Sequence, residues 1–171
     1  MNEVIATGEK SGPRWSPIVE NNLQDGRDLY VLHAEFNGFE ADDVASQHQD
    51  DLKRLTRRAG LLLKKGKESV GYVTYKIIPT AWISESEQAC LLYVNEIFVR
   101  EQNRSPSATV GFLASIRAMA RENSAEYIGW TTGSPVMVEL SQRLELNAKD
   151  MGELHILPVD SLDIRKLTGR L

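Results

Sequence analysis

The sequence is poor in cysteine, in long apolar runs and in blocks of basic residues. Cys90 is the single cysteine of the 171 residues, so no disulfide can form within the chain, which fits a reducing compartment. The N-terminal stretch MNEVIATGEKSGPRW has no long apolar run, so we expect neither a signal peptide nor a membrane span and place the protein in the cytoplasm. A formal net charge of −4 argues against a dedicated nucleic-acid binder.

The composition that remains is that of a soluble globular protein of one domain. Hydrophobic residues make up 42% of the chain and charged residues 26%, which is enough apolar material for a core without metals or disulfides. Basic residues gather only in KRLTRR (53–58) and KKGK (64–67). We interpret this segment as a solvated surface and keep a nucleic-acid contact as the minor alternative.

The order of the periodic segments predicts an α/β (α+β) fold with a mixed, mostly antiparallel central sheet flanked by helices. Residues 1–28 have no regular period and are expected to form an irregular N-terminal segment, which leaves a single domain over 29–171. The expected strands are 29–36, a hairpin within 61–79, then 89–100, 126–132 and 153–160. The expected helices are 40–60, 107–123 and 134–146.

The turn NRSPSAT (103–109) joins the strand expected at 89–100 to the helix expected at 107–123. Proteins often hold phosphate where a strand turns into a helix, because the first N–H groups of the helix point outward and its dipole favours negative charge. Such turns are usually glycine-rich, whereas Ser107 and Thr109 stand here where glycine is expected. The alternative is a plain helix start with Ser105 as N-cap.

This element order and this turn resemble the GNAT superfamily, the GCN5-related N-acetyltransferases, over residues 29–160. Gly71 matches a glycine that the family has at the start of the preceding strand. The family's apolar register before the turn is matched by Leu92, Val94, Ile97, Phe98 and Val99. Its pyrophosphate turn, Arg/Gln-x-x-Gly-x-Gly/Ala, falls on residues 104–109, where Arg104 matches but Ser107 and Thr109 do not.

The resemblance implies an acyl-CoA-dependent N-acyltransferase that moves the acetyl group of acetyl-CoA to an amine by direct attack, without a metal. Glu96 holds the position of an acidic residue that many members use as general base, and Ser141 stands where many have a tyrosine as acid. The acceptor would be a small-molecule or protein amine, and a homodimer stays open. The residues implied to hold the cofactor are Ile97, Phe98, Val99, Arg104, Ser105, Ser107, Ala108, Thr109 and Val110.

The departures from the family pattern favour a second class of function. The β-branch of Thr109 crowds the place of a phosphate oxygen, and one lost charge-assisted hydrogen bond costs about 1.5–3 kcal/mol, or roughly ten- to a hundredfold in affinity. The Ser141 hydroxyl is a poor proton donor at neutral pH. His33 could face an acceptor cleft, and Tyr72, Tyr75 and Tyr93 could line an acceptor groove, although strand residues of these types are more often structural. The alternative function is a catalytically degraded GNAT-like binding or structural module.

Overall fold

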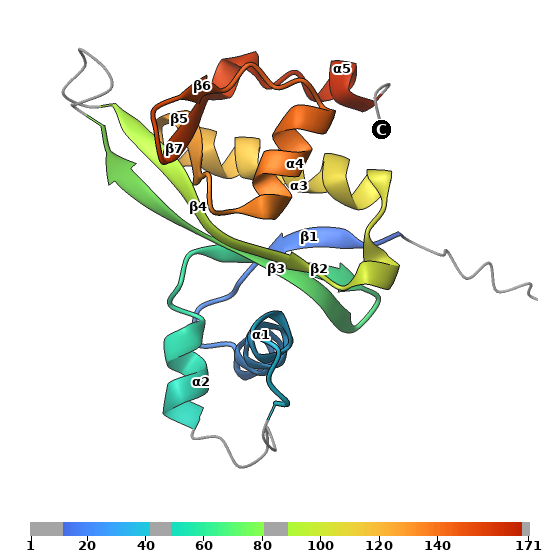
Figure 1. Ribbon diagram of the computed structural model, residues 1–171. Coiled ribbons are helices and arrows are strands. Elements are labelled where there is room, and N and C mark those ends of the chain that lie inside the picture. Colours follow the sequence, from blue (N-terminus) through green and yellow to red (C-terminus); the bar gives the residue numbers. More distant parts are fainter. Residues whose placement is uncertain (1–11, 42–48, 81–88, 169–171) are drawn as a thin grey trace, which may run out of the picture.

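The computed structural model describes residues 12–41, 49–80 and 89–168. In it, the chain forms a seven-stranded sheet with helices on both faces (Figure 1). The strands are β1 (Arg14–Pro17), β2 (Gly60–Lys65), β3 (Glu68–Pro79), β4 (Cys90–Val99), β5 (Ala125–Thr131), β6 (Lys149–Asp150) and β7 (Leu154–Pro158). Their order in the sheet is β1-β2-β3-β4-β5-β7-β6. Only β4 and β5 pair in parallel, so the predicted mixed, mostly antiparallel sheet is confirmed.

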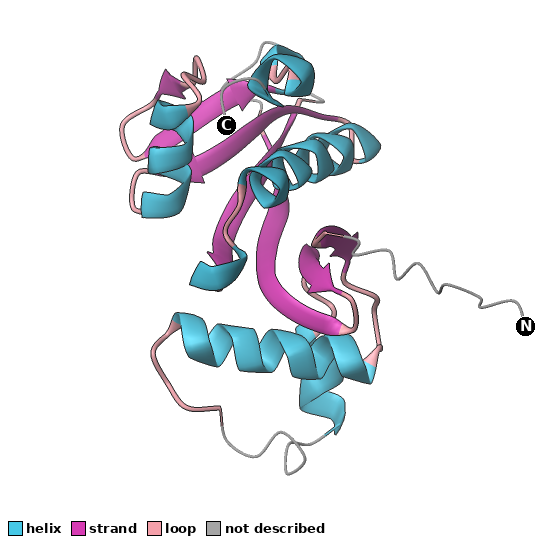
Figure 2. Ribbon diagram, turned by 90° about the vertical axis from the view of Figure 1, so that its right-hand side faces the viewer, coloured by secondary structure: helices cyan, strands magenta, loops and turns pink. Residues whose placement is uncertain are grey.

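The helices divide between the two faces of this sheet. They are α1 (Leu23–Phe36), α2 (Gln49–Leu55), α3 (Pro106–Glu122), α4 (Pro135–Arg143) and α5 (Ile164–Thr168), with short 3-10 turns at Glu101–Asn103 and Val159–Ser161. Figures 1 and 2 show α1 and α2 on one face and the other three helices on the opposite face. None of the helices in the described ranges has the length and apolar character needed to cross a membrane.

Each face has its own hydrophobic core. Leu29 and Leu32 of α1 pack against Leu62 and Tyr72 of the sheet. The larger core lies on the other face, where α3 contributes three large side chains, Phe112, Leu113 and Ile116. Because neighbouring strand residues point to opposite faces, Ile97 belongs to the larger core whereas Phe98 packs on the α1 side.

Residues 29–36 are helical, so the strand predicted there is wrong. Asn22 caps α1 by accepting hydrogen bonds from the N–H groups of Gln24 and Asp25. Leu29 and Leu32 then recur at helical spacing on the buried side. The β-branched and aromatic residues of this segment suggested a strand, but packing on the sheet decided for a helix.

The described residues bear out most of the other predicted elements. The hairpin turns at Gly66 with a positive φ of 63°, and the strand at 89–100 is central in the sheet. The helices predicted at 107–123 and 134–146 are present as α3 and α4, and the last two predicted strands are present as β5 and β7. Each lies within a few residues of its predicted bounds. In the predicted helix 40–60 the described helix is Gln49–Leu55, and residues 42–48 lie outside the described ranges. Gly60 begins β2, so its prediction as a helix terminator is wrong.

Three elements appear where no regular structure was predicted. β1 lies within the segment 1–28 and pairs antiparallel with β2, β6 pairs antiparallel with β7, and α5 follows the last strand. The sequence that connects the predicted strands 61–79 and 89–100 is polar, and residues 81–88 of this connector lie outside the described residues. The last strand, β7, pairs with β5 and β6 of the same chain. The homodimer stays a prediction.

Candidate functional site

The strand β4 has partners on both sides along its first half and on one side along its second half. Its pairing with β5 ends where Val94 lies opposite Trp130. Its pairing with β3 continues to Val99. The second half of β4 therefore has an open edge on the side that β5 has left.

A β-bulge marks the point where the two halves meet. Thr74 of β3 pairs with Glu96, and its neighbour Tyr75 pairs with Val94, so Asn95 is an extra residue in β4. Bulges of this kind bend a strand and increase its local twist. The bulge thus accounts for the direction in which β4 leaves β5.

The backbone of the second half of β4 presents hydrogen-bonding groups to the open edge. The Arg100 N–H donates to the Val70 carbonyl at 3.0 Å, which makes Val99 a non-hydrogen-bonded residue of the antiparallel ladder. Because such pairs alternate along the ladder, Ile97 has the same orientation. The N–H and C=O groups of Ile97 and Val99 therefore face away from β3.

A cavity of about 430 Å³ lies along this open edge and reaches the start of α3. The predicted cofactor residues that line it are Ile97, Phe98, Val99, Arg104, Ser105, Ala108 and Thr109. Ser107 and Val110 are not among its lining residues. The structure thus brings seven of the nine predicted residues to one cavity.

The start of α3 combines a helix cap with a cavity wall. Ser105 Oγ accepts from the Ala108 N–H at 3.1 Å, and the Ser105 carbonyl accepts from the Thr109 N–H at 3.0 Å. Ser105 is thus the N-cap, as the plain-cap alternative expected. The Ser107 N–H has no hydrogen-bond partner among the described residues, so it remains available to a ligand.

Arg104 closes one end of the open edge. Its Nε donates to the Val99 carbonyl at 3.0 Å. One of the outward-facing backbone groups is therefore used within the protein. The N–H groups of Ile97 and Val99 have no hydrogen-bond partner among the described residues.

Several lining residues were missed by sequence reasoning because they come from distant elements. Trp15 of β1 donates from Nε1 to the Ala108 carbonyl at 2.9 Å. Its ring lies so close to Gly111 that a Cβ there would sit 3.2 Å from Trp15 Cδ1. The other lining residues that were missed are Phe36, Phe112, Val136, Glu139, Leu140 and Arg143. No local motif in the sequence indicates them.

Ser141 lies on α4 but does not line the cavity. The lining residues of α4 form one stripe, Val136, Glu139, Leu140 and Arg143. At about 100° per residue, Ser141 is roughly 150° around the helix from the middle of that stripe. Its role as an acid stays a prediction.

Glu96 lies on the α1 face of the sheet, in a cluster with His33 and Tyr72. The Tyr72 hydroxyl donates to Glu96 Oε2 at 3.2 Å. His33 Nδ1 lies 3.1 Å from that hydroxyl and 3.4 Å from Glu96 Oε2. Burial, and then the charge of Glu96, raise the pKa of Tyr72. Tyr72 therefore keeps its proton and holds the carboxylate by donating to it.

The cavity reaches toward this cluster. Phe36 of α1 and Phe98 of β4 line the cavity, and both rings contact Tyr72, with centroids 6.4 and 6.2 Å away. Phe112 and Leu140 line the cavity from α3 and α4 on the opposite face. Side chains from both faces of the sheet thus meet at the open edge of β4.

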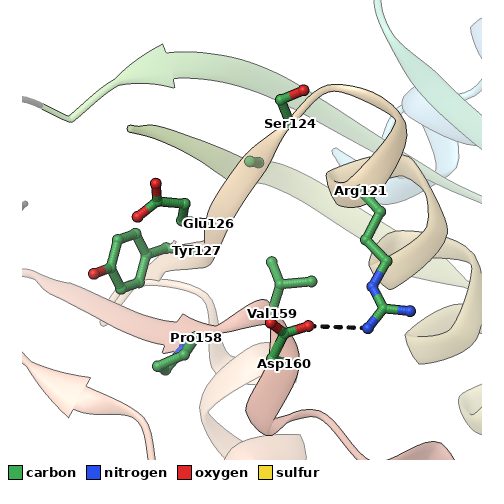
Figure 3. Close-up of a pocket in the computed structure, with 8 residues that line it drawn as sticks. Arg121, Ser124, Glu126, Tyr127, Pro158, Val159 and Asp160 are labelled. Atoms are coloured by element: carbon green, nitrogen blue, oxygen red, sulfur yellow. Dashed lines mark hydrogen bonds and ion pairs between the residues drawn. The ribbon is translucent and has the colours of Figure 1, made fainter. Parts of the chain in front are cut away.

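A second concavity, of about 510 Å³, lies at the opposite end of the β4–β5 pair. Figure 3 shows Arg121 turned toward Asp160, away from Glu126 and Tyr127, and the two charges pair at 2.9 Å. Ligands of open α/β sheets bind beyond the carboxyl ends of strands, whereas this concavity is at the amino end of β5. The cavity at the open edge is therefore the candidate site.

The basic residues of the segment 53–67 are partly paired with acids. Lys53 lies 3.9 Å from Asp50, and Arg54 lies 3.8 Å from Asp51. Lys64 contacts the buried Asp25 at 2.8 Å. These pairs reduce the positive charge that the segment could offer a nucleic acid. Within the described ranges, no group of three or more His, Cys, Asp or Glu side chains is placed to hold a metal ion.

No protein-family model matches the chain, and no curated protein sequence matches it. Solved structures of acetyltransferases do resemble it. A ribosomal-protein-alanine N-acetyltransferase from Brucella melitensis biovar Abortus 2308 has a TM-score of 0.61 at 14% identity, over 83% of this chain and 96% of that one. The aminoglycoside acetyltransferase meta-AAC0020 from an uncultured soil metagenomic sample, in complex with sisomicin, has a TM-score of 0.63 at 12% identity, over 82% and 91%.

A third similar structure is that of a predicted acetyltransferase from Clostridium acetobutylicum with acetyl-CoA. Its TM-score is 0.57 at 11% identity, over 82% of this chain and 92% of that one. Identities this low establish a likeness of fold. The chain accordingly has the fold of the GNAT superfamily of acetyltransferases.

Proposed function

We propose that the protein is an acyl-CoA-dependent N-acetyltransferase that transfers acetyl from acetyl-CoA to an amine by direct attack. The observation that carries this proposal is the 430 Å³ cavity, which joins the open edge of β4 to the start of α3. The fold supports it, since the similar solved structures are acetyltransferases and one of them contains acetyl-CoA.

Acetyl-CoA would lie along the open edge with its diphosphate at the start of α3. The free N–H groups of Ile97 and Val99 suit the amide and thioester oxygens of the pantetheine arm, which accept hydrogen bonds. The Ser107 N–H and the positive end of the α3 dipole suit the diphosphate. Thr109, with Ser105, would border the phosphates.

Glu96 would act as the general base. Glu96 would take a proton from the ammonium form of the acceptor, and the neutral nitrogen would then bond to the acetyl carbonyl carbon. The C–S bond would break to release the CoA thiolate, and the new amide would lose its second proton to the surrounding water. Tyr72 would orient the carboxylate through the hydrogen bond that it donates. The thiolate would take its proton from water, and Ser141 would act only through such a water because it does not line the cavity.

A specific observation favours the second candidate, a GNAT-like binding or structural module. Several polar groups at the phosphate end have partners within the protein, namely the Ala108 and Thr109 N–H groups and the Val99 carbonyl. If acetyl-CoA cannot displace these bonds, the start of α3 is only a capped helix. The two candidates therefore differ in whether the cavity binds acetyl-CoA at all.

Thermal unfolding with and without acetyl-CoA separates the two candidates. Ligand at about 100 times its Kd stabilises a protein by about 2.7 kcal/mol, which raises Tm by roughly 5–10 °C for a domain of this size. We expect such a shift for the wild type, a smaller one for Arg104→Ala, and the full shift for the control Arg121→Gln at the other end of the sheet. No wild-type shift at millimolar acetyl-CoA would favour the module.

A further inference from the structure

The mouth of the cavity is apolar on two opposite sides. Phe36 of α1 and Val136 of α4 both line the cavity, and both are exposed, to 45% and 42%. Single exposed hydrophobic residues are common on protein surfaces. Two of them facing one cavity form a surface that an apolar ligand would cover.

Aromatic rings make up the wall on the α1 side. The ring of Phe36 lies 6.0 Å from that of Phe98 and 6.4 Å from that of Tyr72, edge to face in both cases. Ring pairs at these distances hold each other in place. The α1 side of the cavity therefore offers a fixed surface to a flat apolar group. Glu96 lies beside this surface, because it accepts the hydrogen bond of the Tyr72 hydroxyl.

The neighbouring carboxylates are engaged by arginine. Arg100 binds both oxygens of Glu35, through Nε at 2.8 Å and Nη2 at 2.6 Å. Its Nη1 binds Glu68 at 2.5 Å. Glu96, by contrast, accepts from the neutral Tyr72 hydroxyl and lies beside His33. Among the described residues, Glu96 thus has neither an arginine nor a lysine as a partner and can receive an ammonium group.

The charged side chains that line the cavity are one carboxylate and two guanidinium groups. They are Arg104, Glu139 and Arg143, which together carry one net positive charge. The charge of Arg58 also acts on Tyr72 from the α1 side. A ligand with several ammonium groups would have Glu96 and Glu139 to pair with but would also meet the two guanidinium groups, which disfavours it relative to a ligand with a single ammonium group.

We infer that the acceptor is a primary amine with a single positive charge on an aromatic or other bulky apolar group. This inference rests on the proposed function. The apolar group would lie on Phe36 and Phe98, and the ammonium group would point to Glu96. Polycations such as the aminoglycosides would accordingly be poor acceptors for this protein.

The test compares acceptors in one assay, after calorimetry has measured acetyl-CoA binding. Release of free CoA is followed with 2-phenylethylamine, spermidine and kanamycin. We expect kcat/KM for 2-phenylethylamine to exceed that for either polycation at least about tenfold. Phe36→Ala should lower this value about tenfold, mainly through KM, while the control Phe39→Ala, which is 71% exposed and does not line the cavity, should change it little.

A second variant tests the charge argument. Arg100→Gln frees Glu35 and Glu68 and should raise kcat/KM for spermidine relative to 2-phenylethylamine by about tenfold. Arg121→Gln, which removes a distant ion pair, should leave that ratio unchanged.

The outcomes distinguish the inference from the proposed function. If acetyl-CoA binds but the polycations are the better acceptors, or 2-phenylethylamine is not acetylated, the inference is overturned and cofactor binding stands. If acetyl-CoA does not bind, both are overturned. The wild-type comparison decides even if a variant fails to fold.

Discussion

The two halves of β4 differ in what their backbone groups contact. From Cys90 to Val94 the strand lies between β3 and β5. Beyond the bulge it has β3 alone, and the backbone of Ile97 and Val99 faces a cavity. Under the proposed function, the first half of β4 serves stability and the second half binds the ligand, because satisfied backbone groups hold a sheet together and unsatisfied ones are available to a ligand. Substitutions in the two halves should differ accordingly.

The largest effect on stability is expected in the first half. Leu92 is fully buried and pairs with Ile77 and Ile128. Leu92→Ala should lower the free energy of unfolding by about 2–5 kcal/mol, measured by urea denaturation. The control Val136→Ala, at the cavity mouth, should change it by less than about 0.5 kcal/mol. Equal losses in the two variants would contradict the division.

The largest effect on activity is expected from Glu96, in the second half. Glu96→Gln keeps an acceptor for Tyr72 but removes the base, so kcat should fall about a hundredfold or more with the free energy of unfolding little changed. The control Glu126→Gln replaces a carboxylate at the other end of the sheet. If both variants kept wild-type kcat, Glu96 would not be the base.

A smaller effect, a gain in affinity for acetyl-CoA, is expected where a side chain narrows the cavity. Thr109→Gly should tighten acetyl-CoA binding about tenfold, because phosphate could approach the helix start more closely. It should also cost about 1 kcal/mol of stability. Ser115→Gly is the matched control, since Ser115 lies further along α3 and does not line the cavity. Calorimetry would measure both, and weaker binding in Thr109→Gly would contradict the close-approach argument.

Tyr72, which lies opposite the second half of β4, gives a pH dependence. Its pKa is raised by burial and by Glu96, so above about pH 10 the unfolded chain loses the proton first and the free energy of unfolding falls with pH. Below that pH both states keep the proton, so Tyr72 causes no change in the free energy of unfolding with pH. Tyr72→Phe should make the decline shallower, in urea denaturation between pH 9 and 11. Parallel declines would show that Tyr72 ionises alike in both states.

The smallest effect is expected at the far end of β5. Arg121 and Asp160 form an exposed ion pair. Arg121→Gln should cost less than about 1 kcal/mol and leave the acetyl-CoA-induced rise in Tm unchanged. A loss of that rise would place the ligand at the wrong end of the sheet for this account.

Local signals explain which parts of the fold could be predicted. The hairpin at Gly66, the apolar strand β4 and the capped start of α3 each depend on neighbouring residues, and all three are present. α1 was mistaken for a strand because Leu29 and Leu32 become informative only once they pack on the sheet. Propensity is a weak guide where tertiary contacts decide.

Local sequence signals could predict only part of the candidate site. The strand and the turn that line the cavity are contiguous in sequence, so a motif could indicate them. Trp15 lies 93 residues from its hydrogen-bond partner Ala108, and Phe36 and Arg143 come from separate helices. No spacing rule links these segments. The bulge at Asn95 also arises from pairing with β3 and not from a turn motif.

Amide hydrogen exchange followed by NMR, with and without acetyl-CoA, tests the central claim most directly. We expect slowed exchange at the Ile97 and Val99 N–H groups when the ligand is added, and unchanged slow exchange at Leu92, whose pairing is already complete. Unchanged exchange throughout the second half of β4, or slowing confined to Glu126 and Tyr127, would contradict the assignment of the open edge as the binding site.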